Sequence, residues 1–79
     1  MAVLRMFAGA REAAGTARDV FDASTVGELL DQADAKYGSG FSAVRETSRI
    51  WLNGDATDRN AAISERDEVA VLPPVSGGA

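Results

Sequence analysis

The sequence predicts an α+β fold, in which a mixed β-sheet has one main amphipathic helix packed on one of its faces. Two short apolar runs, at residues 3–7 and 69–72, lie near the two ends of the chain. Apolar runs of this length are typical of buried strands, and we expect both in mid-sheet, side by side and buried on much of both faces. One helical stripe, at residues 26–37, falls between them and can cover a face of the sheet.

The segment after the first strand is rich in alanine and bounded by glycine. Residues 8–15 predict one or two helical turns that end at Gly15, because glycine adopts the left-handed conformation of a helix end without strain. Residues 16–22 then alternate moderately between polar and apolar side chains, with Val20 and Phe21 among the apolar ones. This pattern predicts a second strand.

The central helix has the strongest local signals. Thr25 and Glu28 have the spacing of a capping box, in which the threonine hydroxyl accepts a hydrogen bond from the amide of the glutamate. Gly38 stands where a glycine commonly ends a helix. The apolar residues between these signals recur at helical spacing and form one stripe: Val26, Leu29, Leu30, Ala33 and Tyr37.

The second half of the chain predicts a connector, a hairpin and a last strand. Residues 39–48 form the connector, which could carry a helical turn with Phe41 and Val44 facing inward. Asn53-Gly54 is a strong hairpin signal, because both residue types tolerate a positive φ. The remaining elements are a strand before the hairpin, a short irregular edge after it and an acidic turn before the last strand: residues 49–52, 55–64 and 65–68.

Composition limits the chemistry that this chain can perform. Its 79 residues suffice for one small domain, and we assign residues 1–74 to the domain and 75–79 to a flexible tail. Cysteine and histidine are absent, which excludes a disulfide, a thiolate nucleophile, a Cys/His zinc site and a histidine base. We therefore expect no metal site.

Charge and hydropathy narrow the set of partners. The net charge is −4, whereas nucleic-acid binding depends on clustered lysine and arginine, so we expect no nucleic-acid partner. No apolar run approaches the ~18–20 residues of a membrane span. The N-terminal segment also lacks the basic region of a secretion signal. These observations predict a cytoplasmic protein that does not contact membranes.

Two further features have structural explanations. Asp55 and Asp58 follow the hairpin but lack the spacing of a calcium loop, so we interpret them as polar turn residues. Trp51 and Tyr37 could stack on a ligand, but in so small a domain core or half-core packing is the better explanation. The exception would be an exposed face of the sheet, where an apolar side chain can serve a partner.

The C-terminal segment VLPPVSGGA, residues 71–79, is unusual in its context. Pro73 and Pro74 cannot continue a sheet ladder, so they stop the strand and direct the chain away in an extended form. Small residues allow a backbone to enter a narrow channel, and a terminal carboxylate there is a candidate nucleophile toward an activated phosphate. The residues of this arm reach at most ~13–14 Å when extended: Val75, Ser76, Gly77 and Gly78.

These features together resemble the MoaD/ThiS family of ubiquitin-like sulfur carrier proteins, and most of all its MoaD branch, the small subunits of molybdopterin synthase. The likeness rests on "AREAAG" after the first strand, the capped helix, "WLNG", "DEVAVLPPV" and Gly77-Gly78. It implies a β-grasp fold and a carrier that binds no cofactor and has no catalytic side chain of its own.

The resemblance also implies a reaction cycle at the tail. An E1-like activating enzyme would use ATP and Mg²⁺ to adenylate the carboxylate of Gly78. Sulfur would then replace AMP to give a thiocarboxylate. The loaded tail would enter the large subunit of molybdopterin synthase, whose side chains perform the chemistry, or another sulfur-accepting synthase.

The family's partner-facing surface can be carried over onto matching positions. It implies that Phe7, Arg11 and Leu72 contact partners. Ala56 stands just after the hairpin, at a position that often has a larger apolar residue, and it either weakens one contact or marks a different partner.

Ala79 departs from the family pattern, because the carriers normally end at Gly-Gly. A peptidase that removes Ala79 before activation is the explanation we favour. The others are an activating enzyme that tolerates one small extra residue, and an Ala79 that is not native.

Two other functions stay open at this point. One is a sulfur carrier for cysteine, thiamine or a sulfur-containing natural product, because the tail chemistry would be the same. The other is a ubiquitin-like modifier that is conjugated to lysines. Lys36 is the only lysine of the chain, so lysine-linked polymers of it would have one attachment point.

Overall fold

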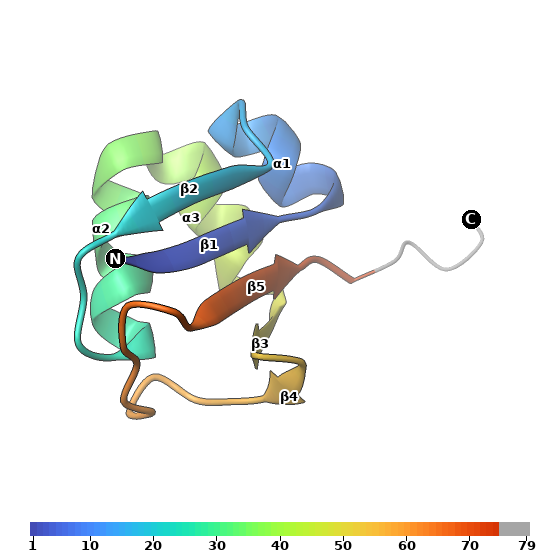
Figure 1. Ribbon diagram of the computed structural model, residues 1–79. Helices are drawn as coiled ribbons and strands as arrows, with labels where there is room; N and C mark the ends of the chain where they lie inside the picture. Colours follow the sequence, from blue (N-terminus) through green and yellow to red (C-terminus); the bar gives the residue numbers. More distant parts are fainter. Residues whose placement is uncertain (75–79) are drawn as a thin grey trace.

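The computed structural model describes residues 1–74, and the predictions made for residues 75–79 lie outside the described part. Strands and helices alternate along the first half of the chain, and the last three elements are strands (Figure 1). Their bounds are β1 Ala2–Met6, α1 Ala8–Ala14, β2 Arg18–Phe21, α2 Val26–Tyr37, α3 Ser39–Glu46, β3 Arg49–Leu52, β4 Asp55–Ala56 and β5 Glu68–Leu72.

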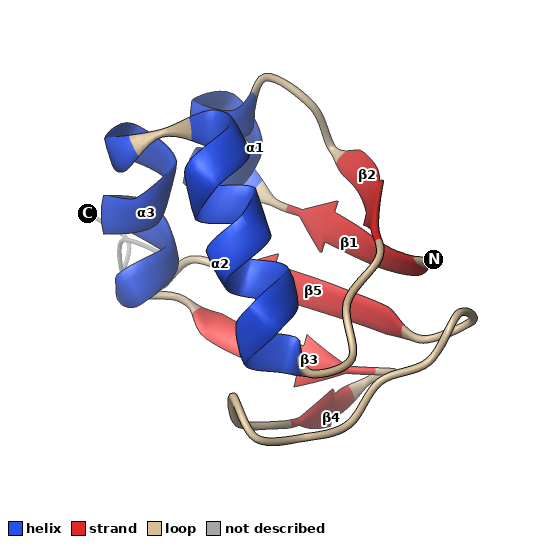
Figure 2. Cartoon of the chain, turned by 90° about the vertical axis from the view of Figure 1, so that its left-hand side faces the viewer, coloured by secondary structure: helices blue, strands red, loops and turns tan. Residues whose placement is uncertain are grey.

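The strands of residues 1–74 form one mixed sheet in the order β2-β1-β5-β3-β4. β1 and β5 are parallel neighbours at its centre, and the other pairs are antiparallel. The two apolar end strands therefore lie side by side, as the sequence predicts. The helices all cover the same face of the sheet (Figure 2). This is the α+β, β-grasp arrangement that the resemblance implies.

The core lies between the sheet and the helices. In β1, Leu4 and Met6 are buried against the helices, and Val69 and Val71 of β5 are buried beside them. The opposite face, which points toward the viewer in Figure 1, is open, and Arg5 of β1 is exposed there. The expectation that both strands are buried on much of both faces is therefore wrong, because only one face of each is fully buried. The described residues provide helices for one layer only, and the second face stays in contact with solvent.

The N-terminus of α2 is fixed by a cap and by a neighbouring loop. The hydroxyl of Thr25 accepts a hydrogen bond from the amide of Glu28 at 3.1 Å, which confirms that part of the predicted capping box. The amide of Gly27 donates to the carbonyl of Arg59 at 3.0 Å. A Cβ at Gly27 would lie 3.1 Å from that same carbonyl oxygen, so the close approach of the loop depends on glycine.

The structure confirms the helical turns predicted after the first strand and extends the turn predicted in the connector to a full helix. α1 has two turns and ends at Gly15, whose φ of 77° confirms the predicted left-handed cap. Residues 39–46 of the predicted connector form α3, in which Phe41 is fully buried. Arg45 of α3 forms an ion pair with Asp34 of α2, which joins the two helices.

The predicted hairpin is confirmed at Asn53 and Gly54, whose φ angles are 50° and 88°. The Asn53 side chain also ties the turn to the start of β5, because its amide donates to Asp67 at 2.9 Å and its carbonyl accepts from the amide of Glu68 at 2.9 Å. These bonds hold the end of β3 against β5. No helix within residues 1–74 is long and apolar enough to cross a membrane.

Candidate functional site

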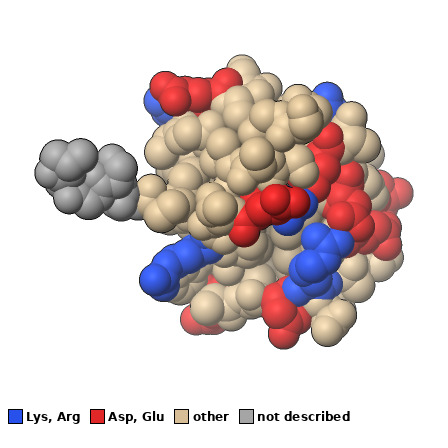
Figure 3. All heavy atoms as spheres, turned by 180° about the vertical axis from the view of Figure 1, so that it is seen from behind, with Lys and Arg blue, Asp and Glu red and all other residues tan. Residues whose placement is uncertain are grey.

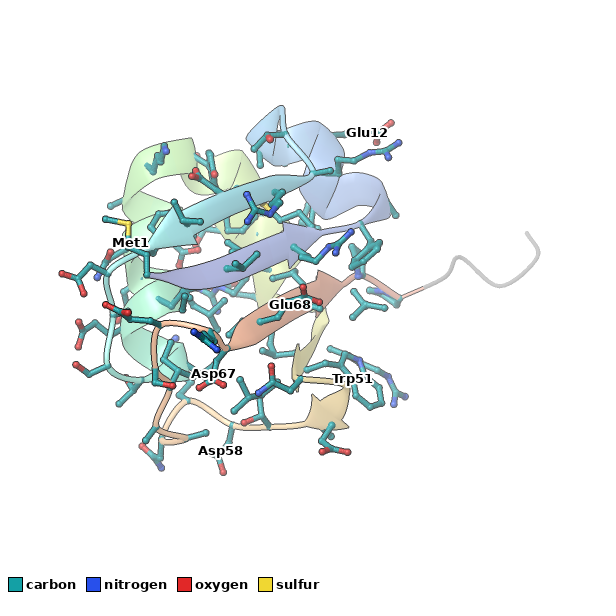
Figure 4. The ribbon with its side chains drawn as sticks, viewed as in Figure 1. Met1, Glu12, Trp51, Asp58, Asp67 and Glu68 are labelled. Atoms are coloured by element: carbon teal, nitrogen blue, oxygen red, sulfur yellow. The ribbon has the colours of Figure 1, made fainter. Side chains whose placement is uncertain are left out.

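A shallow hollow of about 260 Å³ lies on the open face of the sheet, next to the point where β5 ends. Its walls come from β3, β5, the hairpin and Phe7, the residue that follows β1 (Figure 4). The hollow extends along β5 from Glu68, next to the hairpin, to Leu72, where the strand ends. The chain leaves the sheet here through Pro73. The residues that line the hollow are Phe7, Trp51, Gly54, Glu68, Ala70 and Leu72.

The strand register explains why a hollow forms here. Trp51 lies opposite Ala70 of β5 on one side and opposite Ala56 of β4 on the other. The large indole therefore stands between two small side chains on the same face, because directly opposed residues of paired strands share a face. Gly54 adds no side chain at the hairpin. The indole is half-buried, and space remains beside it.

Phe7 is presented at the corner between β1 and α1. Its amide donates to the carbonyl of Val71 at 3.3 Å, which keeps the backbone in the sheet. The next residue, Ala8, has a φ of 48°, an uncommon value for a residue with a Cβ and one that turns the chain sharply into α1. The ring of Phe7 remains 42% exposed at the edge of the hollow.

Charges surround the hollow on the open face. Glu68 lies in the lining and forms an ion pair with Arg5 at 3.5 Å, so this carboxylate is balanced by its neighbour. Arg49 lies opposite Leu72 in the register of β3 and β5 and is exposed. In the part of the chain that the structure describes, no carboxylate forms an ion pair with Arg49. The side of the hollow nearest the tail is therefore basic.

The sequence matches one family model over nearly its whole length. The match runs from residue 4 to residue 78 and is to the ThiS family. The chain belongs to the ThiS family. The matched range includes every residue that lines the hollow and continues through Gly77-Gly78.

Named relatives of this ThiS-family chain are sulfur carriers and modifiers. It is 36% identical over 76 residues to the "Molybdopterin synthase sulfur carrier subunit" of Arabidopsis thaliana, a match that covers 92% of this chain and 78% of the relative. The crystal structure of SAMP1, a small archaeal modifier protein from Haloferax volcanii, is 31% identical and superposes with a TM-score of 0.81 over 98% of both chains.

A third similarity concerns a protein seen with its partner. It is a chain of the "protein-protein complex of subunit 1 and 2 of Molybdopterin-converting factor" from Helicobacter pylori 26695. The TM-score is 0.74, and the match covers 98% of this chain and 97% of that one at 24% identity. At this identity the likeness is one of fold. It shows that a chain of this fold assembles with a second subunit.

The structure brings together some of the residues that the resemblance implies. Phe7 and Leu72 both line the hollow. Ala56 is exposed on β4, opposite Trp51. Arg11 lies one turn into α1, where its amide donates to the carbonyl of Phe7 at 3.3 Å, and its side chain is exposed. The predicted tail residues lie outside the described residues: Val75, Ser76, Gly77, Gly78 and Ala79.

Four of the residues that line the hollow were not predicted from the sequence to be part of the site. Trp51, Gly54, Glu68 and Ala70 all belong to the hollow, although the exception noted for an exposed sheet face applies to Trp51. The signal that could have found them is the alternation of side chains along a strand, which places Glu68, Ala70 and Leu72 on one face. The expectation of burial on both faces concealed this signal.

The helix-covered side of the molecule has a different character. Carboxylates gather there over α2, on the part of the surface far from the tail (Figure 3). Lys36 of α2 lies in this region, with its ammonium 2.6 Å from Asp19 and 5.6 Å from the centre of the Phe21 ring. Tyr37 donates its hydroxyl proton to the same Asp19. The only lysine of the chain is thus held by an ion pair.

Asp19 is the acceptor at the centre of this cluster. Burial raises the pKa of its carboxyl, but the hydrogen bonds from Lys36 and Tyr37 lower it by more, so that the pKa is lower than its usual 3.8. The pKa of Tyr37 is raised by burial and by its bond to the carboxylate. Within residues 1–74 no group of three acidic residues is placed to hold a metal ion.

Proposed function

We propose that this chain is the sulfur carrier subunit of a molybdopterin synthase, with the carboxyl carbon of Gly78 as the site that carries sulfur. The observation that carries the proposal is the 36% identity to a molybdopterin synthase sulfur carrier subunit over 92% of the chain. The family match through Gly78 supports the tail as the reactive segment.

Activation of the tail needs an ATP-dependent partner. The carboxylate oxygen of Gly78 attacks the α-phosphorus of ATP, pyrophosphate leaves, and an acyl-adenylate forms on an E1-like enzyme. A persulfide of that enzyme system then attacks the carbonyl carbon and AMP leaves. A thiol cleaves the resulting acyl disulfide, which leaves the thiocarboxylate on Gly78. The chain itself provides the acyl group and no acid or base, which agrees with its lack of histidine and cysteine. The cycle consumes ATP, which supports our proposal of a cytoplasmic location.

The geometry of residues 1–74 suits a carrier that must dock and extend its end into another protein. β5 is hydrogen-bonded on both sides, to β1 and β3, and continues directly into Pro73. The hollow lies beside this exit, so a partner that seats on Phe7 and Leu72 also faces the base of the tail. Docking and delivery then use one surface, and the large subunit provides the catalytic side chains.

Ala79 sets one condition on this proposal. A carboxylate on Ala79 is one residue beyond Gly78, and we propose that a peptidase removes Ala79, so that the reactive carbonyl becomes that of Gly78. In that case a chain that carries Ala79 is a precursor, and activation starts after trimming.

A second candidate function is that of a protein modifier. The 31% identity and TM-score of 0.81 to SAMP1 favour it. In that case the acyl-adenylate would be attacked by a lysine of a target protein, and the product would be an isopeptide. Sulfur delivery to another synthase, for cysteine, thiamine or a natural product, would use the same activated tail.

The deciding experiment is the intact mass of the protein after incubation with the activating enzyme of the same genome, ATP, Mg²⁺ and a sulfur source. The full-length chain and a chain that ends at Gly78 are compared, with ATP omitted as the control. We expect the oxygen-to-sulfur mass increase only in the chain that ends at Gly78. A chain that ends at Gly78 and gains no sulfur, while a known carrier does so with its own enzyme, would contradict the proposal. High-mass conjugates in cells that express a tagged chain would support the modifier function instead.

A further inference from the structure

The unexplained feature of the open face is its largest side chain. Trp51 lies in β3 between Ala70 and Ala56, and neither alanine can cover the flanks of the indole. The side chain is half-buried on the open face, whereas the fully buried large side chains all belong to the core between the sheet and the helices. An aromatic residue that is supported from below and open at its sides has the properties of an interface anchor.

The size of the hollow beside Trp51 indicates what kind of group fits. About 260 Å³ is below the roughly 300–1,000 Å³ of pockets that hold small molecules. The lining is mostly apolar, with Phe7 and Leu72 facing the space beside the indole. The ion pair with Arg5 balances the one carboxylate of the lining. One or two aliphatic side chains of another protein match this space and this polarity.

The charge next to the hollow indicates what should surround those aliphatic side chains. Arg49 lies on the same face of β3 as Trp51, two residues away, and opposite Leu72. No ion pair within residues 1–74 involves it, and it stands at the end of the sheet where the tail begins. A partner carboxylate at this position would lie over the base of the tail.

We propose that Trp51 is the anchor by which the tail-receiving subunit recognises this carrier, with an aliphatic side chain of that subunit seated against the indole and a carboxylate of that subunit paired with Arg49. The inference rests on the proposed function, because it takes the occupant to be the protein that receives the tail. The position of the hollow beside the exit of β5 argues for that occupant, since one docked protein then covers the hollow and the base of the tail together.

The test measures the dissociation constant between the carrier that ends at Gly78 and the molybdopterin synthase large subunit of the same genome. Trp51→Ala should weaken binding about 10-fold or more, as truncation of a central aromatic anchor does. Arg49→Glu should weaken it as well, and the loss should shrink at high salt, because it comes from charge repulsion. Val20→Ala is the matched control: Val20 is exposed on β2, at the far edge of the sheet from β3, and its removal should leave affinity within about 2-fold.

The outcomes distinguish a failure of the anchor from a failure of the proposed function. If the wild-type carrier binds and both Trp51→Ala and Arg49→Glu bind equally well, the anchor is refuted and the proposed function stands. If the wild-type carrier does not bind at all, the proposed function and the anchor both fall. Melting curves show whether each variant is folded. Should Trp51→Ala unfold, Trp51→Leu and Arg49→Glu test the same contact, and normal affinity of both would refute it.

Discussion

Replacing two phenylalanines with alanine, one at a time, should separate the residue that holds the fold from the residue that meets a partner. Phe41 is fully buried on α3, with its ring 5.2 Å from that of Tyr37 in an edge-on arrangement. Removing a buried phenylalanine costs about 3–5 kcal/mol through lost burial and the cavity that remains. A domain of 79 residues has a free energy of unfolding of roughly 4–12 kcal/mol. Phe41→Ala should therefore remove a large part of the free energy of unfolding.

Thermal unfolding followed by circular dichroism measures this effect. At about 4–8 °C per kcal/mol for a domain of this size, Phe41→Ala should lower Tm by about 12 °C or more. Phe7→Ala removes the same atoms from a side chain that is 42% exposed, and its cost should stay within about 1 kcal/mol. Its effect should appear as weaker binding to the large subunit, because Phe7 lines the hollow. Equal losses of Tm in the two variants would refute the assignment of Phe41 to the core and Phe7 to the docking surface.

Two further predictions concern the helix-covered side. Because the pKa of Asp19 is lowered in the folded state, its contribution to stability is full above the ordinary value of 3.8 and is lost as pH falls through the folded-state pKa. Asp19→Asn should therefore lower the free energy of unfolding by about 1 kcal/mol at neutral pH, and the loss is this small because Lys36 is exposed. The Tm difference from wild type should vanish in acid. A Tm difference that persists in acid would contradict this pH dependence. Gly27→Val should cost about 1–3 kcal/mol in chemical denaturation, because its Cβ would lie 3.1 Å from the carbonyl oxygen of Arg59. Gly40→Ala, in open space on α3, is the control and should be neutral or stabilising by about 0.5 kcal/mol, because alanine has the higher helix propensity. A similar loss of stability in both variants would contradict the role given to the close approach at Gly27.

Local sequence signals predicted the elements that begin or end at a residue with a strong conformational preference. The hydroxyl of Thr25, the left-handed Gly15 and the pair Asn53-Gly54 each specify a backbone conformation by themselves. The pairing of the two end strands also followed from the sequence, because their apolar character requires central positions.

Elements that depend on tertiary burial were harder to predict. α3 begins between two glycines, Gly38 and Gly40, which lower helix propensity, and its formation depends on the burial of Phe41 beneath the other helices. The sequence predicted Phe41 to face inward but not the length of helix that carries it. Local propensity is a weak guide where one buried side chain decides the outcome.

Two residues of the candidate site were predicted from the sequence, but the hollow that they line was not. Phe7 and Leu72 came from the resemblance, and the structure places both at the hollow. The role of Trp51 was not predicted, because its two alanine neighbours come from β4 and β5, and the register of three strands is a property of the folded sheet.

The position of β5 has a mechanical consequence for a protein that works through its end. β5 lies between β1, which runs parallel to it, and β3, which runs antiparallel. A partner that grips the tail and pulls along it loads β5 lengthwise, so the hydrogen bonds on both of its sides share the force in shear and do not open one after another. A carrier whose end left from an edge strand such as β4 would resist the same pull with hydrogen bonds on one side only. Under the proposed function, the central position of β5 would therefore let partners pull on the tail while the domain stays folded.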